Sequence, residues 1–257
     1  DGIRDTSVTG VQTCALPIYL LGPLPEEAAS APAAPAEVVV SGGGEQRDAR
    51  VVATYDAIAE PYAATLVPEL AQMPFERWLL ARVAEEAGAL GAPAVEVGSG
   101  PGHITAHLCS LGLPTVGLDL SPGMVAEARR RFPEGDYREG DLRRLMRPET
   151  ASGWSAVLAW YSLIHLAGSE LPDAVAALTR PLLPGGVLVL ALHAGAGVKH
   201  QPVWFDQQVD IDIALHEQAA VTGVLEAAGL REIEWYRRGP ILSRREATER
   251  LYVLARR

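Results

Sequence analysis

Segments typical of β-strands alternate with segments typical of helices from residue 75 to the end of the chain. The strand-like segments are short and almost continuously apolar, which is the pattern of strands buried on both faces. Such alternation predicts an α/β fold, with a parallel sheet covered by helices on both sides. The last two strand-like segments have no helix between them and predict an antiparallel finish. Strands are expected within residues 93–97, 114–120, 137–142, 154–166, 187–194, 231–238 and 249–257, and helices within 75–90, 103–112, 121–132, 169–182 and 217–230.

The composition, net charge and cysteine content of the chain disfavour several classes of function. The chain has 257 residues, of which 48% are apolar, and its net charge is −10. A strongly acidic protein is a poor candidate for binding nucleic acid or an anionic membrane through its general field. Its two cysteines, Cys14 and Cys109, are too few for a disulfide framework or a metal cluster. These features favour a cytoplasmic protein that binds neither nucleic acid nor membrane.

The N-terminal part carries no fold pattern. Residues 1–18 resemble the in-frame translation of a short-read sequencing adapter, so we expect them to pack on nothing. Residues 19–50 are rich in Pro, Ala, Glu and Gly, which is typical of a flexible lead-in. The first methionine is Met73, so the native start is expected at a non-Met codon or in lost sequence. The folded domain is expected over 51–257, and Pro61 and Pro68 are expected to break its first helical segment.

The sharpest local signal is VEVGSGPG at residues 95–102, where a strand runs into a glycine-rich turn. Glycines let the backbone approach a ligand, and the following helix points free N–H groups at it. Position 103 is His, so the dinucleotide pattern G-x-G-x-x-G is absent, which disfavours NAD and FAD. Asp119 ends the next strand, where a carboxylate can accept both hydroxyls of a ribose. Since Ser121 already suits the N-cap of the next helix, the two features together predict a nucleoside site.

Five segments at these spacings resemble the successive motifs of class I S-adenosylmethionine-dependent methyltransferases: VEVGSGPG, GLDLSPGMVAEAR, REGDL, LAWYSLIHL and LLPGGVLVLALH. The resemblance covers about residues 51–257. It implies a Rossmann-like, doubly wound sheet of seven strands in the order 3-2-1-4-5-7-6, with strand 7 antiparallel. It also implies that S-adenosyl-L-methionine is the cofactor and that its methyl group passes by in-line displacement to an acceptor, which we expect to be a small molecule.

The resemblance further implies which residues bind the cofactor. Glu96 and the loop at 98–102 would hold its methionine part, and Asp119 its ribose. An N-terminal helical lid over 51–90 would close the site with Tyr55 and Tyr62, unless these are ordinary packing aromatics. The full implied set is Tyr55, Tyr62, Glu96, Gly98, Ser99, Gly100, Gly102, Asp119, Leu120, Met124, Asp141, Leu142, Ala159 and Trp160.

The acceptor side is less marked in the sequence. A hydroxyl acceptor needs a base to take its proton, whereas a neutral amine needs none. His193 ends an apolar strand at the expected ligand-binding edge, and His165 follows the preceding strand, so they are the candidate bases, although either can be structural. The long segment 195–215 contains Trp204 and Phe205 and is expected to form an extra strand or flap beside the acceptor. No metal is expected, because no histidines have metal-ligand spacing backed by other ligands.

Other functions stay open at this level. An NAD(P)-dependent oxidoreductase shares the general architecture but lacks its fingerprint here. A methyltransferase for RNA or protein is disfavoured by the acidic balance. A cofactor-binding regulator without activity would keep the same fold, since fold alone does not define function.

Overall fold

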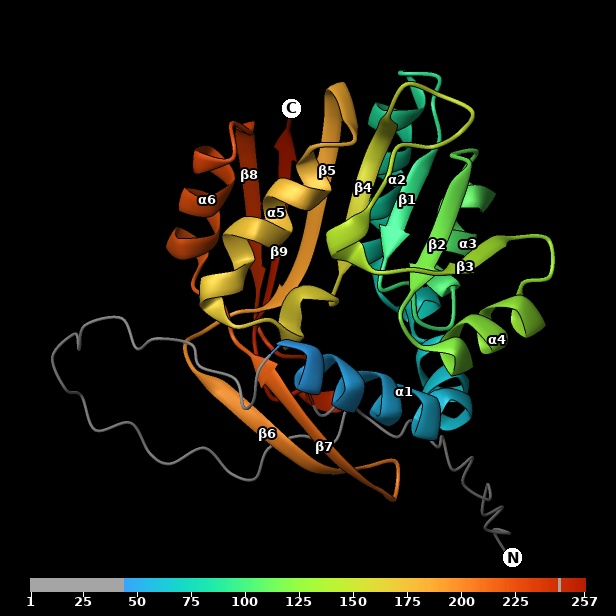
Figure 1. Cartoon of the computed structure of the whole chain (residues 1–257), viewed down its shortest axis with the longest axis vertical. Helices are drawn as coiled ribbons and strands as arrows, with labels where there is room; N and C mark the ends of the chain where they lie inside the picture. The colour runs from blue at the N-terminus through green and yellow to red at the C-terminus, as the bar shows by residue number, and fades with distance from the viewer. Residues whose placement is uncertain (1–43, 245) are drawn as a thin grey trace, which may run out of the picture.

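The computed structural model describes residues 44–244 and 246–257, arranged around a central sheet (Figure 1). The sheet order is β3-β2-β1-β4-β5-β9-β8. Strands β3, β2, β1, β4 and β5 pair in parallel, and β9 runs antiparallel to both β5 and β8. This confirms the predicted order, because β8 and β9 are the sixth and seventh strands of this sheet along the chain. The strands are β1 (Ala94–Val97), β2 (Thr115–Asp119), β3 (Asp136–Glu139), β4 (Trp154–Trp160), β5 (Leu182–His193), β8 (Arg231–Arg238) and β9 (Arg250–Arg256).

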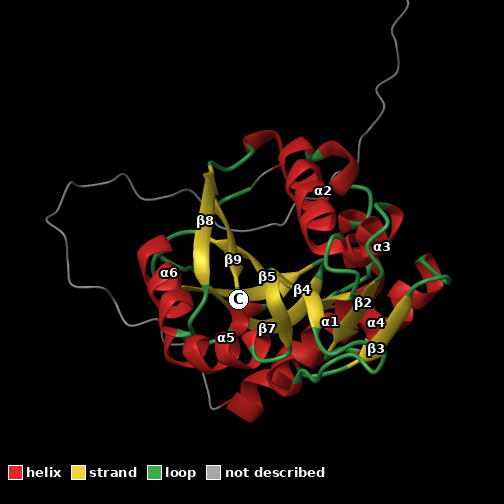
Figure 2. Ribbon diagram, turned by 90° about the horizontal axis from the view of Figure 1, so that it is seen from above, coloured by secondary structure: helices red, strands yellow, loops and turns green. Residues whose placement is uncertain are grey.

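Helices cover both faces of the sheet, as seen end-on in Figure 2. Helices α2 (Pro74–Gly88) and α3 (His103–Ser110) pack on one face, and α5 (Leu171–Thr179) and α6 (Gln218–Ala227) pack on the other. Along β5, Val187 and Val189 face the first pair of helices, and Leu188 and Leu190 face the second. Burial on both faces is why this strand reads as one unbroken apolar run. No helix of the described residues has the length and apolarity needed to cross a membrane.

Helix α1 (Gly44–Leu66) lies across the edge of the sheet where the parallel strands end, next to the N-terminus of α4 (Pro122–Arg131) (Figure 1). It corrects two expectations. The helix begins at Gly44, so residues 44–50 do not belong to a flexible lead-in. It also passes through Pro61, because buried Ile58 and Ala63 hold both sides of the proline in place. The expectations for residues 1–43 otherwise lie outside the described residues.

Polar contacts to distant parts of the chain fasten α1. The guanidinium of Arg47 is buried and donates to both oxygens of Glu170 at 2.5 and 2.8 Å. In the middle of the helix, the Asp56 carboxylate accepts hydrogen bonds from the Ser121 hydroxyl and from the backbone N–H of Gly123. These donors lie at the N-terminus of α4, where a negative charge is favoured. Helix α1 is therefore held as a fixed cover over the ends of the parallel strands.

Removal of the Glu170 carboxylate is expected to destabilise this cover. The Glu170→Ala variant leaves the Arg47 charge buried without its bidentate partner, which costs about 3–5 kcal/mol for a fully buried pair. Because the Glu170 side chain is 34% exposed, we expect a loss of about 2 kcal/mol in the free energy of unfolding. Urea denaturation measures it. Glu134→Ala is the control, since exposed Glu134 forms no ion pair within the described part of the chain; an equal loss in both variants would contradict the role of Arg47.

The segment after β5 forms a two-stranded hairpin of β6 (Val198–Trp204) and β7 (Gln207–Ala214), which confirms the expected extra strands. Its two-residue turn places Phe205 and Asp206 at φ values of 51° and 60°. Both are left-handed, as a tight hairpin turn of this length requires. The hairpin packs beside α1 (Figure 1). The lid was expected over 51–90, but only its part before α2 lies over the strand ends. Helix α2 instead packs on one face of the sheet.

Candidate functional site

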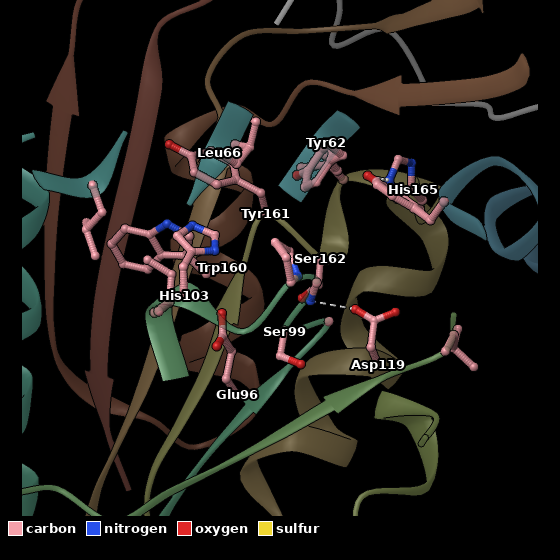
Figure 3. Close-up of a pocket in the computed structure, with 18 of the residues that line it drawn as sticks. Tyr62, Leu66, Glu96, Ser99, His103, Asp119, Trp160, Tyr161, Ser162 and His165 are labelled. Carbon is pink, nitrogen blue, oxygen red and sulfur yellow. Dashed lines mark hydrogen bonds between the residues drawn. The ribbon is translucent and has the colours of Figure 1, made fainter. Parts of the chain in front are cut away.

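A cavity lies between the carboxyl ends of the parallel strands, α1 and the hairpin (Figure 3). About 1380 Å³ of it is free of atoms, part of which is open to solvent. Residues far apart in the sequence line it together, as expected at this edge of a doubly wound sheet. The structure brings most of the sequence-predicted residues to its wall: Tyr55, Tyr62, Glu96, Gly98, Ser99, Gly100, Asp119, Leu120, Leu142, Trp160, His165 and His193.

Four residues of the predicted set lie outside the lining. Met124 and Ala159 are fully buried in the core. Gly102 precedes α3 with φ +80°, and a Cβ there would approach the Tyr137 ring to 2.5 Å. The Asp141 carboxylate accepts the backbone N–H of Arg143 at 2.9 Å and so caps the short 3-10 helix Leu142–Arg144. These four residues therefore do not face the cavity.

The glycine turn after β1 is shaped for close approach. Gly98 has φ +69°, and a Cβ there would lie 2.3 Å from that of Ser162. Gly100 has φ +51°, yet a Cβ there would meet no atom within 4 Å. The first glycine is therefore needed for packing against the segment after β4. The second keeps the cavity open and exposes backbone to a ligand.

Asp119 is hydrogen-bonded to the glycine turn. One carboxylate oxygen accepts the backbone N–H of Gly100 at 2.7 Å, and the other accepts that of Ser121 at 2.8 Å. Figure 3 shows the first of these bonds, with Asp119 and Ser99 on the same side of the cavity. Burial raises the pKa of Asp119 to about 6, and the two N–H groups oppose that rise. Asp119 is thus ionised at neutral pH and presents a negative charge to the cavity.

Glu96 lies deeper in the same wall and is almost fully buried. The hydroxyl of Thr105 donates to its carboxylate. Burial is the main cause that raises the pKa of Glu96 to about 8, and the nearby charge of Asp119 raises it further. Glu96 is therefore largely protonated at neutral pH in the free protein. A cationic group that entered the cavity beside it would favour ionisation.

Aromatic side chains from α1 and the hairpin form the opposite wall. The Tyr62 ring meets the rings of Tyr55 and Trp204 edge-on, with centroids 5.7 and 5.5 Å away. Phe205 stacks on Trp204 and lies 6.0 Å from Tyr62. The two tyrosines therefore do both things considered from the sequence: they line the cavity, and they pack in an aromatic cluster that joins the two covering elements.

The two candidate histidines are both buried, and burial lowers the pKa of each, to about 4 for His165. His165 Nδ1 lies 2.8 Å from the carbonyl oxygen of Asp212, which can only accept. Nδ1 therefore carries the proton, and Nε2 accepts the hydroxyl of Tyr55 at 2.9 Å. His165 links α1 to the hairpin, and its only lone pair is already engaged by Tyr55.

His193 has the opposite tautomer. Its Nδ1 lies 2.8 Å from the Thr248 hydroxyl, which can donate, and 3.0 Å from Nη1 of Arg250, which can only donate, so both contacts suit an accepting Nδ1. A neutral imidazole with an accepting Nδ1 carries its proton on Nε2. This arrangement favours His193 as a hydrogen-bond donor toward the cavity over the role of base expected from the sequence.

Sequence reasoning missed several residues of the cavity wall. Two follow β4 directly: Tyr161, a non-glycine residue at φ +57°, and Ser162. Their place beside Trp160 was a usable signal. Others come from elements that the sequence does not connect to the site: Glu69, Glu76, Arg250 and Tyr252. Only the fold brings these to the strand ends.

Three polar atoms of the wall have no partner among the described residues. Nδ1 of His103, the Ser162 hydroxyl and the Trp204 indole N–H are buried and hydrogen-bond to nothing. All three residues line the cavity. An unpaired buried polar atom carries a desolvation cost of about 1–3 kcal/mol that a polar ligand group removes. The cavity is therefore equipped for a ligand with polar groups.

Comparisons with known proteins agree with this geometry. Residues 94–186, which run from β1 into β5, match the family model described as "Methyltransferase domain". By fold, the chain resembles the DhpI–S-adenosylhomocysteine complex, with a TM-score of 0.59 and 23% identity over 83% of this chain and 98% of that one. It also resembles magnesium protoporphyrin IX methyltransferase from Synechocystis PCC 6803, with a TM-score of 0.59 and 15% identity over 84% of this chain and 100% of that one. Residues 94–186 are therefore similar to a methyltransferase domain, and the chain has the fold of these solved structures.

Curated relatives match somewhat less than half of the chain. The malonyl-[acyl-carrier protein] O-methyltransferase of Serratia marcescens is 33% identical over 47% of this chain and 45% of its own length. The trans-aconitate 2-methyltransferase of Methylobacterium nodulans is 42% identical over 44% and 42%. A dTDP-amino-sugar N,N-dimethyltransferase of Streptomyces venezuelae is 32% identical over 44% and 43%. The chain thus spans less than half the length of each of these relatives.

Proposed function

We propose that this protein transfers a methyl group from S-adenosyl-L-methionine to a small-molecule acceptor. The observation that carries the proposal is the coupling of the glycine turn to Asp119, whose carboxylate accepts the Gly100 N–H at 2.7 Å. That coupling sets an open backbone turn and a fixed carboxylate side by side at the strand ends, which suits a ribose and the group attached to it. Relatives that match part of this chain are named as methyltransferases of small or carrier-bound molecules.

The residues present fit this cofactor. Asp119 would accept the ribose hydroxyls, and Glu96 would meet the amino group of the methionine part. Leu120, Leu142 and the Gly140 backbone line the neighbouring wall, which offers apolar contact to a purine. The remaining predicted contacts come from Tyr55, Tyr62, Ser99 and Trp160, which all reach the cavity.

When bound, the cofactor supplies an activated methyl group on a sulfonium, so the protein mainly orients the acceptor and excludes water. Helix α1 and the hairpin close the cavity with aromatic rings, whose apolar surface excludes water. Trp160 and Tyr161 extend the wall from the end of β4 toward β9. For a hydroxyl acceptor, the Tyr55 hydroxyl would take the proton while it passes its own to Nε2 of His165, because His193 presents an N–H.

The pH dependence of cofactor binding should depend on Glu96. Its pKa of about 8 means that an ammonium group must displace a proton from this carboxyl. Affinity for S-adenosylhomocysteine should therefore rise about tenfold per pH unit from pH 6.5 to 8 and level off above, because the ionised form binds. In Glu96→Gln the rise should disappear. Calorimetry across this range measures both proteins, and subtraction removes the titration of the ligand itself; parallel profiles would contradict the assignment.

Two measurements test the function. Calorimetry with S-adenosylmethionine and with NADH should show binding of the first alone, and binding of NADH would support the oxidoreductase instead. Incubation with a metabolite extract should yield products 14 mass units heavier than their precursors. Tight cofactor binding without any such product would favour the non-catalytic regulator.

A further inference from the structure

The end of the cavity away from the glycine turn contains a buried arginine. Arg250 opens β9 and is only 3% exposed, yet it lines the cavity. It stands directly opposite His193 in the antiparallel pairing of β5 with β9. Because His193 ends β5 at the cavity rim, this register brings both side chains to the same place.

The hydrogen bonds of Arg250 use only part of its guanidinium. Nη1 donates to the Thr248 carbonyl at 2.8 Å, to the Thr248 hydroxyl and to His193 Nδ1. Among the described residues, neither Nε nor Nη2 has an acceptor within hydrogen-bond distance; Nη2 lies 3.7 Å from Glu246. These two donors form the side of the guanidinium that matches a carboxylate with two parallel hydrogen bonds.

Two of the three surrounding carboxylates are engaged elsewhere. Glu76 accepts Arg238 at 2.8 Å and the Tyr252 hydroxyl at 2.7 Å. Glu246 accepts Arg238 at 2.7 Å and the Ile241 N–H at 2.8 Å. Burial raises the pKa of Glu69, the third acid of this wall, and the charges of Arg244 and Arg250 oppose that rise. The buried charge of Arg250 therefore lacks a hydrogen-bonded anion of its own, a costly arrangement unless a ligand supplies one.

The residue that packs beside Arg250 and His193, Tyr161, has a strained backbone. Tyr161 adopts φ +57°, which is unfavourable for a bulky residue. Its ring lies 5.8 Å from the guanidinium carbon of Arg250 and 5.3 Å from the His193 ring. Its hydroxyl donates to that of Tyr252 at 3.0 Å. Strain of this kind persists where the surroundings fix it, and such places are enriched at functional sites.

We infer that Arg250 and His193 form a carboxylate-binding subsite for the methyl acceptor. Nε and Nη2 of Arg250 donate to the two oxygens of the carboxylate, and Nε2–H of His193 donates to one of them. Tyr161 and Tyr252 flank the subsite with aromatic surface, which suits a carboxylate on a flat or apolar body. This inference rests on the proposed function, since it specifies the acceptor of that same site.

The test compares ligands of equal shape and different charge. Ligand-observed NMR measures binding of benzoate, benzamide and benzylamine to the full chain saturated with S-adenosylhomocysteine. Benzoate should bind at least about tenfold more tightly than benzamide, the preference that charge-assisted bonds to arginine provide. Equal binding, or a preference for benzylamine, would overturn the inference; the latter would point to Glu69 and Glu76 as the recognising groups.

Substitutions of Arg250 test whether the preference for benzoate over benzamide comes from this subsite. Arg250→Met should abolish the preference for benzoate, and Arg250→Lys should keep part of it, because a single charge remains without the paired donors. Arg138→Met is the matched control, since Arg138 pairs with Asp136 on the exposed face of β3, and it should behave as the unaltered protein. An unchanged preference in Arg250→Met would refute the subsite. If that variant does not fold, Arg250→Lys decides the matter by a reduced or an unchanged preference.

The same samples separate the two proposals. Binding of S-adenosylhomocysteine is measured first by calorimetry. Absence of that binding contradicts the proposed function itself. Binding of S-adenosylhomocysteine without a preference for benzoate contradicts only the carboxylate subsite.

Discussion

The Gly100→Val variant is expected to lose binding of S-adenosylmethionine while keeping a folded domain. A Cβ at this position would meet no protein atom within 4 Å, so the fold tolerates the added volume. The side chain would instead occupy the space where the turn faces the cavity. We expect the dissociation constant to rise at least about 100-fold, equivalent to about 2.8 kcal/mol. Calorimetry measures the affinity, and thermal unfolding shows that the domain is intact.

Backbone strain is the competing cause of such a loss. Gly100 has φ +51°, and a side chain in the left-handed region costs about 1–2 kcal/mol. Gly112→Val is the matched control, because Gly112 has φ +88°, is equally free of neighbours and lies outside the cavity lining. It should lose a similar amount of stability and bind the cofactor normally. Normal affinity in Gly100→Val would mean that the loop is only a turn between β1 and α3.

The glycine turn and Asp119 were predictable from sequence because one local unit builds them. A strand, a turn, a helix and the next strand place Gly98 and Asp119 at the same sheet edge in any right-handed crossover. The order of the strands followed from the same alternation and from the resemblance. Short-range geometry of this kind leaves few alternatives, so motif spacing carried the prediction.

The cover and the acceptor end could not be predicted in this way, because they depend on contacts between distant residues. Residues 44–50 are helical, and this part of α1 is held by a contact between Arg47 and Glu170, which lie 123 positions apart in the sequence. Tyr55 meets His165 across 110 positions, and Arg250 meets His193 across 57. The tautomer of each histidine follows from these partners. For His193, position in the sequence alone suggested a base, whereas its hydrogen bonds favour a donor. Long-range pairing, not local pattern, decides these roles.

Asp119→Ala is expected to weaken binding of S-adenosylhomocysteine about tenfold to 100-fold. Two hydroxyl groups that donate to an ionised, buried carboxylate contribute about 1.5–3 kcal/mol together. Burial raises the pKa of Asp119 to about 6, so the full effect requires the ionised form and is present above that pH. Below pH 6 the advantage of the unaltered protein should shrink, and the affinities of the two proteins should approach each other. Calorimetry at pH 7.5 and at pH 5.5 measures the difference on either side of this pKa.

A structural effect of the same substitution has to be separated from loss of the ribose contact. Asp119 also accepts the backbone N–H groups of Gly100 and Ser121, so its removal frees the glycine turn. An analogue of S-adenosylhomocysteine without the 2′-hydroxyl distinguishes the two causes. If Asp119 holds the ribose, the unaltered protein should bind the complete ligand more tightly than the analogue, and Asp119→Ala should lose most of this difference. If the carboxylate only orders the turn, the substitution should weaken both ligands by the same factor and leave the difference between them intact.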